Sequence, residues 1–281
     1  MQIGDYDVQL LNTGLFRLDG GAMFGVVPKA LWGKQKPPDE HNRIHMCTNA
    51  LLLRGNGKTI LVDTGIGEHN PAKFCQIYAV DTAVHNLPQC LANHGVAPAD
   101  VTDVILTHLH FDHAGGATIP NENGTFRPAF PNAAYHVQQR HYEWSVEASE
   151  KDRASFLEEN IVPLVQSEQL NLLKSSSEIF PGIELLLSDG HTMAQQMLLI
   201  HSDEQPLFFP ADLIPTSAHV PVPWVMAYDL FPLVTIEEKK QYLNRAASEN
   251  WLVVFEHDPL LPCATVTRMA RGYSIGDAVS L

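Results

Sequence analysis

The segment THLHFDHAGG, residues 107–116, holds three histidines and one aspartate within six residues, directly after an apolar run. Neutral imidazole suits Zn, Fe, Co and Ni, and a carboxylate adds charge balance and can bridge two ions. Because His108 and His110 lie two residues apart, an extended or turning backbone lets both reach one ion. Asp112 and His113, turned by the residues that follow, can serve a second ion. The segment therefore predicts one half of a metal site.

Three later segments repeat this pattern, in which an apolar run ends in a residue that can ligate a metal. These residues are His191, Asp212 and His257. Ligands in α/β folds gather outside the carboxyl ends of strands. Two divalent ions about 3.5–4 Å apart need roughly seven protein ligands. We expect His191 to complete the ligands of the first ion and His257 those of the second. Asp212 is expected to bridge the two ions.

The elements that must position these residues are short apolar runs of strand length, bounded by Gly, Pro, Asn or Asp. They are residues 50–53, 59–62, 104–106, 133–137, 183–187, 197–200, 207–209 and 252–255. The Asn56-Gly57 pair between the first two runs predicts a hairpin.

Helical patterns lie between the predicted strands. We expect a helix over 81–94 with Pro88 at a kink or start, two helices within 138–166, and one over 235–249 that opens with a capping box. Strands precede helices in both halves and no Pro/Gly/Ser-rich linker divides them, which predicts a single domain, 1–281, of two helix-covered sheets. Residues 17–46 and 216–232 show no clean period, and we expect them to be pocket or interface loops, ordinary surface loops being the alternative.

Composition limits the classes of function. A formal net charge of −14 argues against a nucleic-acid-binding surface. Four scattered cysteines without a C-x-x-C pair indicate free thiols in a reducing compartment. The first residues lack the pattern of a signal peptide, and no apolar run has the roughly 20 residues of a membrane span. We therefore expect a cytoplasmic protein with no membrane partner.

The pattern His108-x-His110-x-Asp112-His113, followed in order by His191, Asp212 and His257, resembles that of the metallo-β-lactamase superfamily of dinuclear hydrolases. The resemblance covers nearly the whole chain and includes the early strand and turn at residues 59–65. It implies an α/β fold of the αββα four-layer sandwich type with the metals at one edge of the sheets. It also implies that Asp63 orients a histidine ligand.

Within the superfamily, residues 63–67 and 211–216 look most like the N-acyl-homoserine lactonase-like branch, which includes methyl parathion hydrolase-like relatives. Two positions depart from the pattern. The usual Gly-His-Thr-Pro-Gly reads Gly190-His-Thr-Met-Ala194 here, which leaves the shape of that loop open. Lactonases of this branch place a tyrosine where Pro215 stands, and Tyr228 is our candidate to supply the phenol from a later loop.

The expected chemistry is hydrolysis of a lactone or ester by a hydroxide that bridges two divalent ions, zinc first and Mn, Fe, Co or Ni as alternatives. Asp112 is expected to orient the hydroxide and carry a proton to the leaving alkoxide. The preferred substrate is an N-acyl-homoserine lactone, as in quorum quenching. The alternatives are an organophosphate or aryl ester hydrolase of the methyl parathion hydrolase type, a glyoxalase II-like thioesterase and a non-catalytic metal-binding sensor.

The substrate pocket is less marked in the sequence than the metal ligands. Aromatic and histidine side chains in the two irregular segments are candidates for its wall. They are Phe24, Trp32, His45, His219 and Trp224. The partner is a small-molecule lactone or ester, and the 17–46 arm could support a homodimer.

Overall fold

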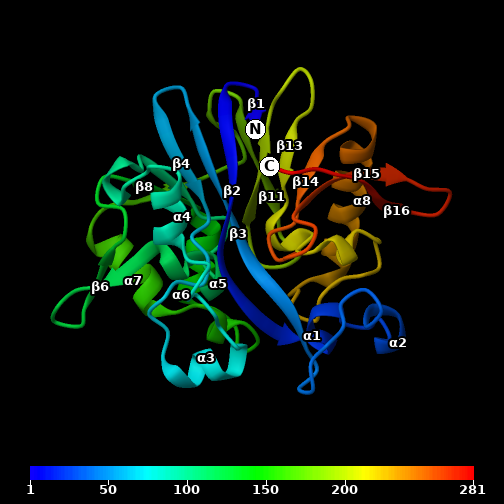
Figure 1. The fold of residues 1–281 in the computed structure, drawn as a ribbon, viewed down its shortest axis with the longest axis horizontal. Helices are drawn as coiled ribbons and strands as arrows, with labels where there is room; N and C mark the ends of the chain where they lie inside the picture. Colours follow the sequence, from blue (N-terminus) through cyan, green and yellow to red (C-terminus); the bar gives the residue numbers. More distant parts are fainter. The chain divides into compact units, whose positions relative to one another are not determined.

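A computed structural model describes all residues, 1–281, and the chain forms two compact units. The first consists of Met1, Tyr6–Leu15 and Thr48–Ser175, and the second of Gln2–Asp5, Phe16–Cys47 and Ser176–Leu281. Two seven-stranded sheets, each with its own helices, make up most of the chain (Figure 1). The prediction of a single domain stays a prediction.

The first sheet has the strand order β1-β2-β3-β4-β5-β8-β9. Its strands are β1 (Gln2–Ile3), β2 (Tyr6–Asp19), β3 (Arg43–Gly55), β4 (Lys58–Val62), β5 (Asp103–Ile105), β8 (Ala134–Gln138) and β9 (Leu170–Leu173). Strands β4, β5, β8 and β9 run parallel, which agrees with their nearly continuous apolar sequences. The carboxyl ends of β4 and β5 therefore meet at one edge, where Asp63 and Thr107 follow them.

Helices cover this sheet and complete a core around it. They are α3 (Ala72–Tyr78), α4 (Leu87–Asn93), α5 (Phe111–Ala114), α6 (Gln139–Val146) and α7 (Glu158–Gln166). Leu87 and Leu91 of α4 and Leu164 of α7 are buried in the same cluster as Leu61 and Val104 of the sheet. A small hairpin of β6 (Thr118–Pro120) and β7 (Phe126–Pro128) lies beside α7.

The second sheet has the strand order β10 to β16, each strand beside the next in sequence. Its strands are β10 (Glu178–Phe180), β11 (Ile183–Ser188), β12 (Gln195–Ile200), β13 (Leu207–Phe209), β14 (Leu252–Val254), β15 (Cys263–Arg268) and β16 (Tyr273–Ala278). All neighbours are antiparallel except β13 and β14, which are parallel. Strands β11, β13 and β14 consequently end at the same edge, which is where His191, Asp212 and His257 follow.

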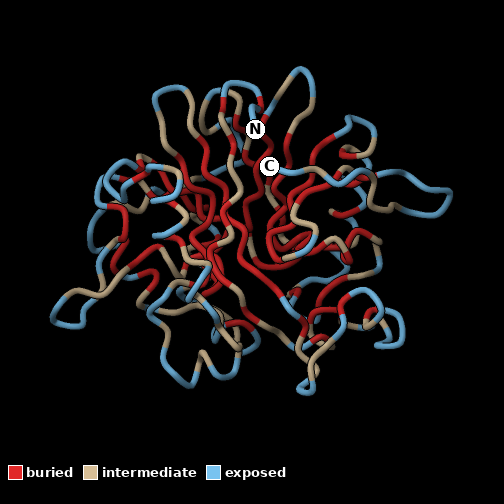
Figure 2. Tube along the Cα trace, viewed as in Figure 1, coloured by how far each residue is buried: buried red, intermediate tan, exposed pale blue.

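The long helix α8 (Pro232–Ser248) packs on the second sheet, and the short helices α1 (Gly20–Phe24) and α2 (Lys29–Trp32) belong to the same unit. Tyr242, Leu243 and Ala246 of α8 join Phe208 and Trp251 in one buried cluster. Figure 2 shows the strands buried along most of their length and the exposed residues gathered in turns and loop ends. None of the helices combines the length and hydropathy needed to span a bilayer.

Most of the predicted elements are confirmed. Every predicted strand coincides with an observed one, and 138–166 holds two helices, α6 and α7. The hairpin at Asn56-Gly57 joins β3 to β4, and both residues have a positive φ, as a tight two-residue turn requires. The 81–94 helix is shorter than predicted, since α4 begins at Leu87 with Pro88 in its first turn.

Two predictions about irregular and capped segments are wrong in part. Residues 17–19 and 43–46 extend strands β2 and β3, so the irregular part of that segment is shorter and contains α1 and α2. The predicted capping box at Thr235 does not begin a helix, because α8 starts at Pro232, which is preorganised for the first helical position. The carboxylate of Glu238 instead accepts hydrogen bonds from residues 188–190.

Candidate metal centre

In the first unit, Asp63 holds the start of the histidine-rich segment. Its Oδ1 accepts a hydrogen bond from the Thr107 amide at 2.7 Å, and its Oδ2 accepts from the Thr107 hydroxyl at 2.6 Å. Oδ2 also accepts from His113 Nδ1 at 3.1 Å. All three residues are buried. A carboxylate that accepts from Nδ1 fixes the tautomer of His113, so that Nε2 presents its lone pair.

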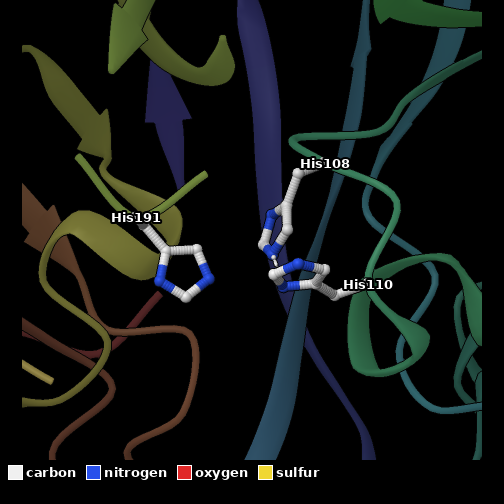
Figure 3. Close-up of side chains that lie close together, drawn as sticks. All are labelled: His108, His110 and His191. Atoms are coloured by element: carbon white, nitrogen blue, oxygen red, sulfur yellow. Dashed lines mark hydrogen bonds between the residues drawn. The ribbon is translucent and has the colours of Figure 1, made fainter. Parts of the chain in front are cut away.

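The rings of His108 and His110 converge on one point. Because the Thr107 hydroxyl donates to Asp63, His108 Nδ1 donates to that hydroxyl at 3.1 Å, which leaves the lone pair on Nε2. His108 Nε2 lies 3.0 Å from His110 Nδ1, and Figure 3 shows the two rings turned toward each other. Two nitrogen ligands of a tetrahedral zinc ion lie about 3.3 Å apart, from Zn–N bonds of about 2.0–2.1 Å. The pair can therefore serve one ion.

The remaining donors of this segment lie on the short helix α5. His113 Nε2 is 3.8 Å from Asp112 Oδ1, and both side chains are buried. The turn is tight because Gly115 and Gly116 pass against the backbone: an added Cβ would lie 2.3 Å from the Ile66 oxygen and 2.4 Å from the Thr64 oxygen, respectively. A side chain at either glycine would therefore collide with the neighbouring backbone.

In the second unit, Asp212 lies between two imidazoles. Its Oδ2 is 3.2 Å from His191 Nε2 and its Oδ1 is 3.0 Å from His257 Nε2. The three side chains are buried and follow β11, β13 and β14, whose ends share one edge of the sheet. A carboxylate that directs one oxygen at each of two histidine nitrogens has the arrangement expected of a ligand shared by two ions.

Each of these histidines is oriented through its other nitrogen. His191 Nδ1 donates to Asp229 Oδ1 at 3.0 Å, and His257 Nδ1 donates to the Cys47 carbonyl at 2.9 Å. The backbone N–H of His257 donates to the Pro215 carbonyl at 2.8 Å. Both rings therefore have the tautomer that directs the Nε2 lone pair toward Asp212.

The loop after His191 closes through a residue in the left-handed conformation. Ala194 stands where the superfamily pattern has glycine, and it adopts a left-handed conformation with φ of 51°. Its N–H donates to Asp189 Oδ1 at 2.7 Å. Asp189 thus closes the loop, and an alanine here adopts a conformation that usually favours glycine.

The aromatic pocket candidates of the second unit pack on one another. Phe24 stacks on Trp32 and on His219, with ring centroids 5.2 and 4.7 Å apart, and its edge meets Trp224 at 5.7 Å. His219 accepts from the Thr216 hydroxyl at Nδ1 and donates from Nε2 to the Met23 carbonyl, both at 2.8 Å. Burial lowers the pKa of His219 to about 3, so its ring is neutral.

The other two sequence candidates lie nearer the solvent. The residue His45 is exposed, but partial desolvation of its ring and the positive charges of Arg17 and Lys36 lower its pKa. Tyr228, the candidate phenol, is 39% exposed and precedes Asp229 in the chain. Its exposure leaves the side chain accessible to a bound molecule.

Three contributors to the site were missed in the sequence. Asp229 lies within the irregular 216–232 segment, and its pairing with His191 spans 38 residues. His141 Nε2 accepts from the Leu109 amide at 2.8 Å and so supports the histidine-rich segment from α6. The Cys47 carbonyl belongs to the backbone, which carries no sequence signal.

A model of the metallo-beta-lactamase superfamily matches residues 48–257. An N-acyl homoserine lactonase of Bacillus cereus is 31% identical over 175 residues, which are 59% of this chain and 63% of the relative. The chain thus spans a little less than two thirds of that relative's length.

Two solved structures extend this likeness over the chain. A probable metal-dependent hydrolase from Staphylococcus aureus is 30% identical, with a TM-score of 0.89 over 99% of this chain and 100% of that one. AidC, a dizinc quorum-quenching lactonase in complex with a product, is 20% identical, with a TM-score of 0.81 over 100% of this chain and 97% of that one. The likeness to AidC supports the fold alone.

Proposed function

Because this chain belongs to the metallo-beta-lactamase superfamily and has its mixed α/β fold, we propose that it is a dinuclear metal-dependent hydrolase that opens N-acyl-homoserine lactones. The substrate class comes from the likeness to the Bacillus cereus lactonase. The observation that carries the dinuclear proposal is the position of Asp212, with one oxygen toward each of two histidine nitrogens.

The donor chemistry of the chain fits divalent transition ions. Five imidazoles and two carboxylates offer buried ligand atoms that could hold a metal: His108, His110, Asp112, His113, His191, Asp212 and His257. The set contains no thiolate and combines nitrogen with carboxylate oxygen, which suits zinc. Zinc is our choice because AidC, which shares the fold, is a dizinc enzyme.

The seven candidate ligands divide into one group for each ion and one residue that both ions share. His108, His110 and His191 would hold one ion. Asp112, His113 and His257 would hold the other, and Asp212 would serve both. When bound, such a pair of cations supplies a nucleophile from water at neutral pH and polarises a carbonyl oxygen.

The chain's own residues then have defined tasks in lactone opening, in which the ring C–O bond breaks and an acid and an alcohol form. Asp63 and Asp229 hold His113 and His191 in the tautomers that present Nε2. The Asp112 carboxylate orients the attacking water and moves a proton toward the leaving alkoxide. Tyr228, with its exposed side chain, donates its phenolic hydrogen to the substrate.

A second substrate class follows from Pro215. Lactonases of this branch carry a tyrosine there, whereas here the residue is buried and its carbonyl accepts from the His257 amide. Without a phenol at this position, aryl esters and organophosphate triesters with good leaving groups are favoured, because such leaving groups need less protonation. This is the alternative function.

The test combines metal analysis with a substrate panel. Purified protein should hold close to two ions per chain, lose activity on chelation and regain it on addition of Zn²⁺. Acyl-homoserine lactones of several chain lengths, aryl esters, a phosphotriester and a glutathione thioester then separate the substrate classes. Fast turnover of the triester with none of the lactones would establish the alternative, and less than one ion per chain with no turnover of any substrate would refute the hydrolase.

A further inference from the structure

One face of helix α8 contacts the loops that carry His191 and Asp229. Thr235, Glu238, Lys239 and Tyr242 are spaced at i, i+3, i+4 and i+7, so they lie on the same side of the helix. The hydroxyl of Tyr242 donates to the Leu187 carbonyl at the end of β11. All four are directed at the second unit's own segments, and none of them ligates a metal in the proposed centre.

Glu238 binds the turn immediately before His191. Its carboxylate accepts from the Ser188 hydroxyl at 2.7 Å, the Asp189 amide at 2.8 Å and the Gly190 amide at 3.3 Å. Gly190 also passes so close to Thr235 that an added Cβ would lie 2.4 Å from the threonine hydroxyl. The turn is therefore held against the helix by three donors and by shape.

Lys239, the next residue, binds the loop that carries Asp229. Its buried Nζ donates to the Trp224 carbonyl at 2.7 Å and to the Pro221 carbonyl at 3.0 Å. Asp229 closes the same loop, because its Oδ2 accepts from the Met226 amide at 3.1 Å. The two hydrogen bonds offset the cost of burying this lysine and attach the loop to the helix.

The two loops are also joined to each other. The Leu230 amide donates to the His191 carbonyl at 3.0 Å, and the Phe231 amide donates to the Gly190 carbonyl at 2.9 Å. Together with the bond from His191 Nδ1 to Asp229, these contacts connect the imidazole, its carboxylate partner and the helix in one hydrogen-bond network.

We propose that Glu238 and Lys239 are paired positioning residues for His191: Glu238 fixes the loop that delivers the imidazole, and Lys239 fixes the loop that delivers its Asp229 partner. The assignment of His191 as a ligand rests on the proposed function. The helix suits the task because Tyr242, Leu243 and Ala246 anchor it in the buried cluster of the sheet. A residue that holds a ligand's partner changes metal affinity without touching the metal.

The same helix offers matched controls. Glu237 and Lys240 flank the pair, are 72% and 53% exposed, and form an ion pair with each other. We therefore compare Glu238→Ala with Glu237→Ala, and Lys239→Met with Lys240→Met. Glu238→Gln is added as a conservative variant that preserves side-chain shape and one oxygen acceptor.

The first measurement is hydrogen exchange of the metal-free protein, which does not depend on the proposed function. Glu238→Ala should raise exchange at the Asp189 and Gly190 amides at least tenfold, because both lose their acceptor. Lys239→Met should raise exchange at the amides of residues 226–231. The control variants should leave both regions as in the unsubstituted protein.

The second measurement is Zn²⁺ affinity by competition with a chelator. Glu238→Ala and Lys239→Met should each lower the affinity for one of the two ions about tenfold, in keeping with the 10- to 100-fold effect of residues that support a ligand. Glu238→Gln should recover part of the loss, which a general decrease in stability would not produce. The other ion should keep its affinity.

The outcomes separate the two proposals. If exchange in both loops and the affinity of both ions stay as in the unsubstituted protein, the positioning role is wrong. If neither the unsubstituted chain nor any variant binds zinc, the proposed function is wrong. The exchange measurement then still decides whether the helix holds the two loops. If Glu238→Ala does not fold, Glu238→Gln is used for both the hydrogen-exchange and the zinc-affinity measurement.

Discussion

Nδ1 of His191 donates a hydrogen bond to Oδ1 of Asp229 over 3.0 Å, and both side chains are almost completely buried. This bond gives the imidazole a single tautomer and a fixed ring orientation. Nε2, on the opposite side of the ring, is then directed toward Asp212 at 3.2 Å. The carboxylate that orients His191, a proposed ligand, thus comes from a segment 38 residues later in the chain.

Asp229→Ala should lower zinc affinity by about 10- to 100-fold at one of two ions, because the histidine loses the partner that orients it. Chelator competition measures this loss. The control is Asp203→Ala, which removes an exposed carboxylate from the same unit. Equal affinities in the two variants would contradict an orienting role for Asp229.

Asp63→Asn should destabilise the metal-free chain by about 1–3 kcal/mol, because an amide nitrogen would replace one of two acceptor oxygens in a buried cluster of donors. Urea unfolding in the presence of a chelator measures the change. Zinc binding should weaken as well, since His113 loses its fixed tautomer. An unfolding midpoint equal to that of the unsubstituted protein would show that these bonds contribute little.

Asp103 should make the stability of the chain depend on acid pH. It accepts from His136 and Lys58 at 2.9 and 2.8 Å, and although burial opposes the shift, these donors lower its pKa to about 2. The folded-state pKa lies below the ordinary value, so the carboxylate stabilises the fold above pH 4 and loses this contribution as the pH falls toward 2. Asp103→Asn should cost about 1–2 kcal/mol at pH 6 and nothing near pH 2, as measured by denaturant unfolding across this range.

Lys239 should make the stability of the chain depend on pH in the neutral to alkaline range. Burial lowers its pKa from 10.5 to about 7, while Asp229 opposes the shift. The unfolded chain then binds more protons between pH 7 and 10.5, so the contribution of Lys239 to stability rises through this window and is lost as the pH falls to 7. The destabilisation caused by Lys239→Met should consequently grow by up to about 1.4 kcal/mol per pH unit between pH 7 and 10. Lys240→Met should show no such slope in the same unfolding titration.

Strand ends could be predicted, and candidate ligands could be proposed, because both depend on local properties of the sequence. A residue that can ligate a metal after an apolar run is visible in a few consecutive letters, and each of the runs before His108, His191, Asp212 and His257 is a strand. The hairpin at Asn56-Gly57 is local in the same sense, because two residues with positive φ determine the turn. The helix α8 shows the limit of such patterns: Thr235 and Glu238 read as a capping box, yet Glu238 finds its donors in the loop at residues 188–190, which is 48 to 50 residues away.

The sequence by itself determined the donor atoms of the proposed centre and the sheet edges that carry them. Only the tertiary structure decided which partner holds each imidazole. Those partners lie 50 residues before His113, 38 residues after His191 and 210 residues before His257. The last is a backbone carbonyl that every residue type offers, so no pattern of side chains could have marked it. Hydrogen-bond partners of this kind are chosen by how strands and loops pack, and packing depends on the whole chain.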